Sequence, residues 1–222
     1  METDCRIDTD KLRGVVFSVD NTELLSYNLH LPDAHYSIPE GVVKIHESAF
    51  KDCESLQKVT FPTSLKIIAS NAFRNSGLRE ISIPESVIEL GGACFEGCCE
   101  LRQAYIHAQI KELEYCLFLG CDKLEKVVIS NQVEKIGEDA FWDCHSLSEI
   151  TWPRNLIEID TTAFHGCTSL VSLTLPSSLR TLGWFPFQDC TSLRMVKLPF
   201  DTQLRRSDYP NPFPSSVSVV RY

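Results

Sequence analysis

The sequence lacks the features that mark several large classes of protein. No apolar run approaches the roughly 18 residues that a membrane-spanning helix needs. The segment Met1–Asp8 has no basic stretch leading into an apolar one, so no secretory signal is predicted. The chain also has no Asn-X-Ser/Thr acceptor for N-glycosylation. We therefore expect no membrane span, and a cytoplasmic location if Met1 is the native start.

Motifs for catalysis and nucleotide binding are absent as well. The sequence contains no Walker loop, no dinucleotide fingerprint, no Gly-x-Ser-x-Gly and no His-Glu-x-x-His. Positive charge is scarce: 21 Lys and Arg stand against 30 Asp and Glu, for a formal charge of −9. A nucleic-acid partner would need a basic surface. The sequence therefore predicts no enzyme, no cofactor, no small-molecule substrate and no nucleic-acid ligand.

What the sequence does contain is a repeat. A phenylalanine recurs at intervals of 23 residues, with one interval of 22 where a residue is missing from Asn75–Leu78. A fixed period of this length is typical of a solenoid, in which each repeat buries its apolar side chains against its neighbours. The seven phenylalanines are Phe50, Phe73, Phe95, Phe118, Phe141, Phe164 and Phe187.

Each repeat combines an alternating segment with a return segment. In Leu170–Pro176, for example, apolar and polar residues alternate, which indicates a half-buried strand. A proline often closes this strand because it has no N–H to continue a ladder. We expect the return segment, Pro-x-x-Val-x-x-Ile, to be extended, and the residues just before the phenylalanine to form a short helical turn. One strand per repeat, always in the same direction, predicts a parallel sheet along one side.

The repeated unit Ile-Pro-x-x-Val-x-x-Ile-x-x-x-Ala-Phe-x-x-Cys-x-x-Leu-x-x-Val resembles the BspA-type, or Treponema pallidum-type, leucine-rich repeat. Residues 38–62 match it closely, and the match continues to about residue 199. The resemblance implies an α/β-type leucine-rich repeat solenoid of about seven 23-residue repeats, with a parallel sheet on one face and short helical or irregular turns on the other. It also implies a role in protein–protein or cell-surface recognition. Many such proteins are exported, so the cell surface is the alternative to the cytoplasm.

The two ends of the chain do not follow the repeat. Because the apolar ends of a solenoid have to be covered, we interpret residues 1–37 as an N-terminal cap, 38–199 as the solenoid and 200–222 as a C-terminal cap of the same structural domain. In the first cap, Val15–Val19 and Leu24–Leu29 are expected to be strands joined across a turn.

The C-terminal cap is expected to contain a rigid loop over Tyr209–Pro214, followed by an edge strand over Val217–Tyr222. Trp184 and Phe185 occupy positions that are polar in most other repeats. The tail could pack on these two aromatic residues, or they could form an exposed docking patch.

The ten cysteines are explained largely by the repeat. Stacked residues lie about 4.8 Å apart, beyond the preferred Cβ separation of about 3.5–4.5 Å for a disulfide, so we expect buried free thiols in the column. Cys144 beside His145 and Asp143 resembles a triad in composition only. No metal site is predicted, whereas Cys99 and Cys116 are candidates for a reactive exposed thiol. The column contains Cys53, Cys98, Cys121, Cys144, Cys167 and Cys190.

Strand residues that point away from the core are the best candidates for binding. Charges of both signs alternate among them, while Tyr105, Val128 and Met195 are residue types favoured at interface centres. Tyr105 and Val128 could instead simply stabilise the sheet as neighbours. The candidate binding residues are Lys58, Glu80, Gln103, Tyr105, Lys126, Val128, Glu149, Thr151 and Met195.

The sequence thus predicts a non-catalytic module that binds a protein partner. The alternative is a structural or self-associating module whose contact is Trp184-Phe185 or the edge strand Val217–Tyr222. If Met1 is the native start, an intracellular scaffold is a further alternative.

Overall fold

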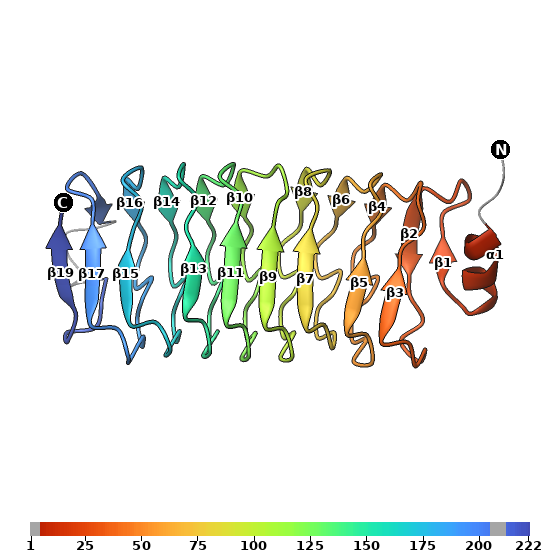
Figure 1. Cartoon of the computed structure of the whole chain (residues 1–222), viewed down its shortest axis with the longest axis horizontal. Helices are drawn as coiled ribbons and strands as arrows, with labels where there is room; N and C mark the ends of the chain where they lie inside the picture. The colour runs from red at the N-terminus through yellow and green to blue at the C-terminus, as the bar shows by residue number, and fades with distance from the viewer. Residues whose placement is uncertain (1–4, 205–211) are drawn as a thin grey trace.

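The computed structural model describes residues 5–204 and 212–222, and its coils are stacked in one row (Figure 1). Helix α1 (Cys5–Leu12) lies at the N-terminal end of the row and strand β19 (Ser218–Arg221) at the C-terminal end. Within those residues no helix is long and apolar enough to cross a membrane. The predicted repeat solenoid is confirmed, with parallel strands and little helix.

The alternating segments form one parallel strand per coil, as predicted. These strands divide into three sheets, with the orders β3-β5, β7-β9-β11-β13 and β15-β17-β19. The side that they share is called the sheet face below. The strands are β3 (His35–Ser37), β5 (Lys58–Thr60), β7 (Glu80–Ile83), β9 (Gln103–Ile106), β11 (Lys126–Ile129), β13 (Glu149–Thr151), β15 (Ser172–Thr174), β17 (Met195–Leu198) and β19.

The return segments are extended, as expected, and also form a second set of parallel ladders that the sequence did not predict. Each strand here is two residues long except β2, and the series is interrupted between β8 and β10. The strands are β2 (Glu23–Ser26), β4 (Lys44–Ile45), β6 (Ile67–Ile68), β8 (Glu89–Leu90), β10 (Glu112–Leu113), β12 (Lys135–Ile136), β14 (Glu158–Ile159), β16 (Thr181–Leu182) and β18 (Gln203–Leu204).

The turn around each phenylalanine is irregular, which is one of the two forms that the family resemblance implies, and the short helical turn expected from the residues before the phenylalanine is not formed there. The N–H of Phe50 donates to the carbonyl of Ala72, and that of Phe118 to Ala140, rather than to a carbonyl four residues earlier. Residues two before and two after each phenylalanine have positive φ, which Asn, Asp and Gly tolerate best. They are Ser48, Asp52, Asn71, Asn75, Ala93, Gly97, Cys116, Gly120, Asp139, Asp143, Thr162, Gly166, Phe185 and Asp189.

The phenylalanines form a stacked column at the centre of the core. Neighbouring ring centroids are 4.9–5.6 Å apart and all seven side chains are fully buried. Tyr27 continues the column beyond Phe50 at 5.0 Å, and Phe213 continues it beyond Phe187 at 5.5 Å. Both ends of the aromatic column are therefore covered by residues outside the repeat.

The cysteine column has a role that the sequence did not reveal. Its thiols are free and buried, as predicted. Cys121 donates its S–H to the carbonyl of Phe95 at 3.2 Å, and Cys144 does the same to Phe118 at 3.2 Å. Burial raises the pKa of Cys98 to about 12. The column therefore joins successive coils through side-chain hydrogen bonds and offers no nucleophile.

The N-terminal segment contains the predicted hairpin, with β1 (Val16–Phe17) antiparallel to β2, preceded by the unpredicted helix α1. Strand β2 then pairs with β4 in parallel. Asp10 on α1 is 4% exposed and accepts a hydrogen bond from the hydroxyl of Tyr36 at 2.7 Å. Burial, together with this bond, raises the pKa of Tyr36. The first segment is thus tied to the coil that contains β3.

At the other end, β19 is the predicted edge strand and pairs in parallel with β17. Its neighbour Tyr222 donates a hydrogen bond to the carbonyl of Leu175, two coils earlier. Most of the predicted loop Tyr209–Pro214 falls on residues 205–211 and so lies outside the described part of the chain. The expectation that the tail packs on Trp184 and Phe185 stays a prediction.

Candidate protein-binding face

The predicted binding residues all occupy outward positions on the sheet face. Strand pairing places Glu80, Gln103, Lys126 and Glu149 side by side in the four-stranded sheet. The same register aligns Tyr105 with Val128, and Val128 with Thr151, in a second row. Lys58 and Met195 lie on β5 and β17, in the two flanking sheets. The structure therefore brings seven of the nine candidates together in one sheet.

Within this sheet two pairs of outward polar side chains contact each other. The hydroxyl of Tyr105 donates to Oε1 of Gln103 at 2.6 Å, and its ring lies parallel to His107 with centroids 6.5 Å apart. The ammonium of Lys126 lies 3.0 Å from a carboxylate oxygen of Glu149, and this pairing raises the pKa of Lys126. The face therefore offers ordered, mutually paired groups instead of unbalanced charge.

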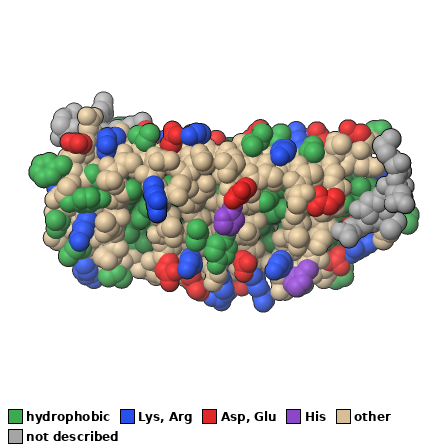
Figure 2. Space-filling model, turned by 45° about the horizontal axis from the view of Figure 1, so that its top comes forward, with side chains coloured by type: hydrophobic (Ala, Val, Ile, Leu, Met, Phe, Trp, Pro, Cys, Tyr) green, Lys and Arg blue, Asp and Glu red, His purple; other side chains and the backbone are tan. Residues whose placement is uncertain are grey.

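Ion pairs between equivalent positions of neighbouring coils recur elsewhere on the surface. Arg102 pairs with Glu125 at 2.6 Å, and Lys135 lies within 3.2 Å of carboxylates on both sides. On the face that Figure 2 displays, Lys and Arg side chains lie among Asp and Glu side chains, with no large area of one sign. Such exposed pairs contribute little to stability, about 0–1 kcal/mol each. Because the charges are paired, this face has no strong positive field that would attract a polyanion.

A cleft opens in the sheet face between β13 and β15, and sequence reasoning missed it. Its volume is about 420 Å³. Figure 1 shows these two strands more widely spaced than their neighbours, and within the described ranges no backbone hydrogen bond joins them. The cleft is lined by Lys126, Ser148, Glu149, Ile150, Thr151, Trp152, Ser172, Leu173 and Thr174.

An aromatic residue explains where the sheet breaks. Trp152 directly follows β13. At the equivalent position most coils have Ile or Leu, and the other exception is Phe61. Each ring packs edge-on against the core phenylalanine of the next coil: Phe61 on Phe73 at 6.0 Å, and Trp152 on Phe164 at 5.5 Å. The ladder is interrupted directly after both coils. The signal was visible in the sequence as two bulky exceptions in an aliphatic column.

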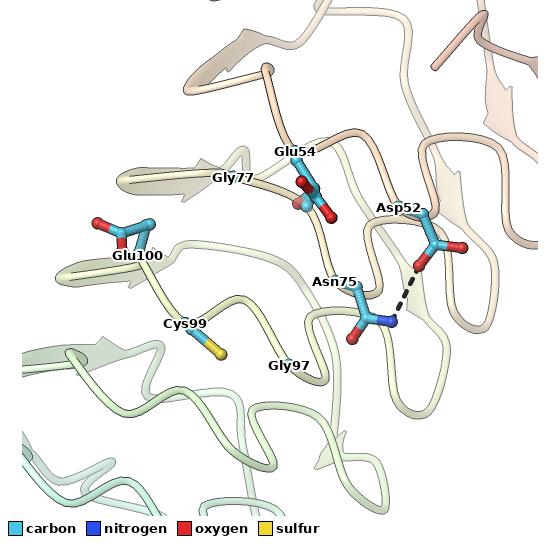
Figure 3. Close-up of a pocket in the computed structure, with 8 residues that line it drawn as sticks. Asp52, Glu54, Asn75, Gly77, Gly97, Cys99 and Glu100 are labelled. Atoms are coloured by element: carbon cyan, nitrogen blue, oxygen red, sulfur yellow. Dashed lines mark hydrogen bonds between the residues drawn. The ribbon is translucent and has the colours of Figure 1, made fainter. Parts of the chain in front are cut away.

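A second hollow, of about 550 Å³, lies on a different side, where the short repeat lacks one residue (Figure 3). There Gly77 approaches the preceding coil so closely that a Cβ would lie 2.0 Å from the carbonyl oxygen of Glu54. Asn75 donates to Asp52 at 2.9 Å beside it. In the described part of the chain, no group of three or more His, Cys, Asp or Glu side chains could hold a metal ion.

The candidate thiols are not activated by their surroundings, because the net effect raises the pKa of both. Cys99 is exposed and Cys116 is half-buried. Burial, with a contribution from Asp139, raises the pKa of Cys116 to about 11, and burial and Asp122 also raise that of Cys99. Reactive cysteines have lowered pKa values. The structure therefore does not favour the hypothesis of a reactive thiol.

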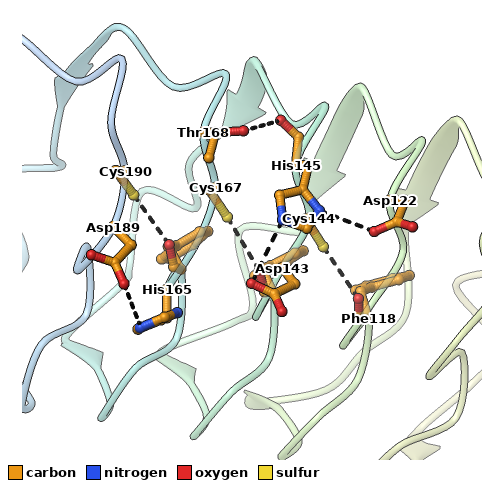
Figure 4. Close-up of polar contacts among 12 residues, drawn as sticks. Phe118, Asp122, Asp143, Cys144, His145, His165, Cys167, Thr168, Asp189 and Cys190 are labelled. Carbon is orange, nitrogen blue, oxygen red and sulfur yellow. Dashed lines mark hydrogen bonds and ion pairs between the residues drawn. The ribbon is translucent and has the colours of Figure 1, made fainter.

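Only two members of the apparent triad around Cys144 contact each other: Nε2 of His145 lies 3.8 Å from Asp143, but the thiol is separate from both (Figure 4). The thiol of Cys144 is buried against Phe118, while Nδ1 of His145 lies 3.0 Å from Asp122 on the exposed side. His165 of the next coil instead stacks on Trp142 at 4.2 Å and lies 3.3 Å from Asp189. These contacts tie neighbouring turns together.

The two alternative contacts predicted from the sequence, Trp184-Phe185 and the edge strand, both lie near the C-terminal end. Trp184 is 43% exposed and Phe185 is half-buried. On β19, Val219 and Val220 are 38% and 44% exposed.

Comparisons with known proteins agree with this architecture. The family described as "BspA type Leucine rich repeat region" matches residues 32–148 and 134–207, in six copies. A leucine-rich repeat protein from Eubacterium ventriosum is 26% identical, with a TM-score of 0.75 over 88% of this chain and 50% of its own. One from Bacteroides ovatus is 27% identical, with a TM-score of 0.69 over 89% of this chain and 57% of its own. The chain thus spans about half the length of these solved proteins. No curated protein matches it.

Proposed function

Since this chain belongs to the BspA-type leucine-rich repeat family, we propose that it is a non-catalytic module that binds a protein partner through its sheet face. The observation that carries this proposal is the four-stranded sheet β7–β13, which presents Tyr105 and Val128 among paired polar side chains. Aromatic residues supply much of the binding energy at protein interfaces, whereas a paired charge at the rim supplies specificity. The partner makes contact along several coils at once.

Site-directed photo-cross-linking in cells that produce the protein tests this proposal. A photoreactive amino acid replaces Tyr105 in one version and Ile88, which is 61% exposed on a different side, in the matched control. We expect a specific protein adduct from position 105 and none of the same mass from position 88. Adducts only at position 88, or equally at both, would contradict a binding role for the sheet face.

The location of the partner is a separate part of the proposal. By the family resemblance, we propose that the module acts at the cell surface. Antibody labelling of intact and permeabilised cells distinguishes the compartments, and labelling only after permeabilisation would favour an intracellular scaffold.

Self-association is the alternative function, and the exposed edge strand favours it. Strand β19 pairs with β17 on one side, and among the described strands none pairs with its other side. Because an open edge with exposed Val219 and Val220 is a template for strand pairing, the mass in solution discriminates the two functions. A mass near 25.1 kDa indicates a monomer. A dimer that Val220→Lys dissociates, while Val171→Lys on another exposed site does not, would support self-association.

A further inference from the structure

Between β13 and β15, a backbone hydrogen bond that joins the preceding coils is missing. In the preceding coils, the N–H of Glu125 donates to Arg102 at 2.8 Å and that of Ser148 to Glu125 at 3.1 Å. The corresponding bond, from the N–H of Val171 to the carbonyl of Ser148, is absent from the described structure, whereas Arg194 donates to Val171 at 2.9 Å one coil later. This series of bonds is present in every preceding coil from Gln57 to Ser148 and resumes at Arg194, so one of its members is missing.

The opening is confined to the sheet face. On the phenylalanine side, the same two coils are joined by the N–H of Phe141 to Ala163 at 2.8 Å and of Asp143 to His165 at 2.8 Å. Strands β12 and β14 also pair normally. Because the coils are held at their usual spacing elsewhere, the cleft is a built feature at Trp152 and not a separation of two halves of the molecule.

The lining suits an extended polypeptide. Ile150, Trp152 and Leu173 give the cleft an apolar inner part, whereas Thr151, Ser172 and Thr174 line its outer part with hydroxyls. A volume of about 420 Å³ falls within the range of about 300–1,000 Å³ that is common for ligand sites. Strand edges that lack a neighbour bind extended segments by adding a strand, with main-chain bonds giving affinity and alternate side chains giving specificity.

We propose that this cleft binds an extended segment of the protein partner, seated between β13 and β15. The proposal rests on the proposed function and names the part of the sheet face where the partner is anchored. The segment accepts a hydrogen bond from the N–H of Val171 and donates one to the carbonyl of Ser148, thereby completing the missing step. An apolar side chain of the segment packs on Trp152, and the next one points outward past Thr174.

The probe for this proposal is a phage-displayed library of random heptapeptides, selected on the wild-type protein and resynthesised as free peptides. Trp152→Ile gives the cleft the aliphatic residue found at Ile129 and is expected to close it. Thr174→Arg blocks the cleft from an exposed position without touching the core. Phe61→Ile removes the other edge-on aromatic residue, far from the cleft, and is the matched control.

We expect the selected peptides to bind wild type and Phe61→Ile alike, and Trp152→Ile and Thr174→Arg at least about tenfold more weakly by calorimetry. N-methylation of the peptide amide that meets Ser148 should weaken binding in the same way. Hydrogen exchange gives an independent readout: the amide of Val171 should exchange rapidly in the free protein and slowly with peptide bound. Slow exchange at Val171 in the free protein would overturn the proposal.

Equal binding to wild type and Thr174→Arg would overturn the proposal as well. So would a selection in which no peptide binds wild type more tightly than it binds Trp152→Ile. The wider proposed function fails differently. If the peptides bind Trp152→Ile and Thr174→Arg as tightly as wild type but bind Tyr105→Ala more weakly, the sheet face binds the partner and the cleft does not. If the peptides require the cleft but no cross-link forms at position 105, the cleft binds a segment and the wider sheet face is not the binding surface.

Discussion

At the scale of single residues, the columns of the repeat carry the fold. Each phenylalanine is packed between the rings of its two neighbours and is fully buried. From Cys98 onward, each cysteine of the column donates to the carbonyl of a phenylalanine in an earlier coil, as Cys167 does to Phe141 at 3.2 Å, whereas Cys53 contacts the carbonyl of Lys51 at 3.7 Å. Ser76 replaces one such thiol and contacts Cys98 at 3.3 Å. The position therefore selects a small hydrogen-bond donor.

Phe118→Ala tests the aromatic column in its middle. Removing a buried phenylalanine costs about 3–5 kcal/mol, which is a large share of the roughly 5–15 kcal/mol that stabilises a domain. We expect a markedly lower melting temperature by circular dichroism. Leu119→Ala, at a half-buried neighbouring position, is the control and should change the melting temperature much less. An unchanged melting curve for Phe118→Ala would contradict the stacking argument.

Cys116 gives a prediction about pH. Its pKa is raised to about 11 by burial and by Asp139, and only the thiolate reacts with iodoacetamide. Below that pKa the thiolate fraction grows about tenfold per pH unit, so alkylation at position 116 should accelerate about a hundredfold between pH 7 and pH 9. Mass spectrometry of the Cys99→Ser variant isolates this site, and a rate that begins to level off at about pH 9 would show that the pKa is not raised above its usual value of about 8.5.

At the scale of elements, the alternating pattern predicted the strands and their direction, because side chains of one face are buried in every repeat. The sequence did not predict the second set of ladders, since two-residue strands such as β12 carry no period of their own. The residues before each phenylalanine also did not show which of the two expected forms, helical or irregular, the turns take. Every second N–H group of a turn donates to the next coil, and this is a tertiary effect that a local pattern such as Glu-Asp-Ala-Phe cannot show.

The breaks in the sheet are an element-scale consequence of single side chains. If the ring at the Trp152 position separates the strands, then Ile129→Trp should open the ladder between β11 and β13. We expect the amide of Ser148, which now donates to Glu125 at 3.1 Å, to lose hydrogen-exchange protection. The added bulk should cost about 1–3 kcal/mol. Ile129→Leu is the control, and retained protection in the tryptophan variant would show that the breaks have another cause.

At the scale of the molecule, the sequence predicted the architecture well and the site only in part. The register placed Glu80, Lys126 and Glu149 on one face, because the period fixes which residues of successive coils are neighbours. It could not show the cleft beside Trp152, which depends on how one ring packs against Phe164. Nor could it show that Phe213 ends the aromatic column, since that contact lies outside the repeat.

The molecule is also predicted to be modular. Each coil is bonded to the coil before it and the coil after it, as Phe118 is bonded to Ala140 and Phe95 to Leu117. Stability in such a solenoid is close to a sum of repeats and nearest-neighbour interfaces. Deleting residues 119–141 removes one complete 23-residue period and joins Phe118 to Trp142 in phase, with Asp143 taking the positive-φ position of Gly120.

We expect this shortened protein to fold with a cooperative thermal transition and to be about 4.8 Å shorter, the spacing of neighbouring strands, by small-angle X-ray scattering. Deleting residues 119–129 instead removes fewer residues but puts every later column out of phase, so the core side chains of the following coils no longer face one another. That variant should fail to fold. If the two deletions behaved alike, the phase of the repeat would not be what holds the coils together.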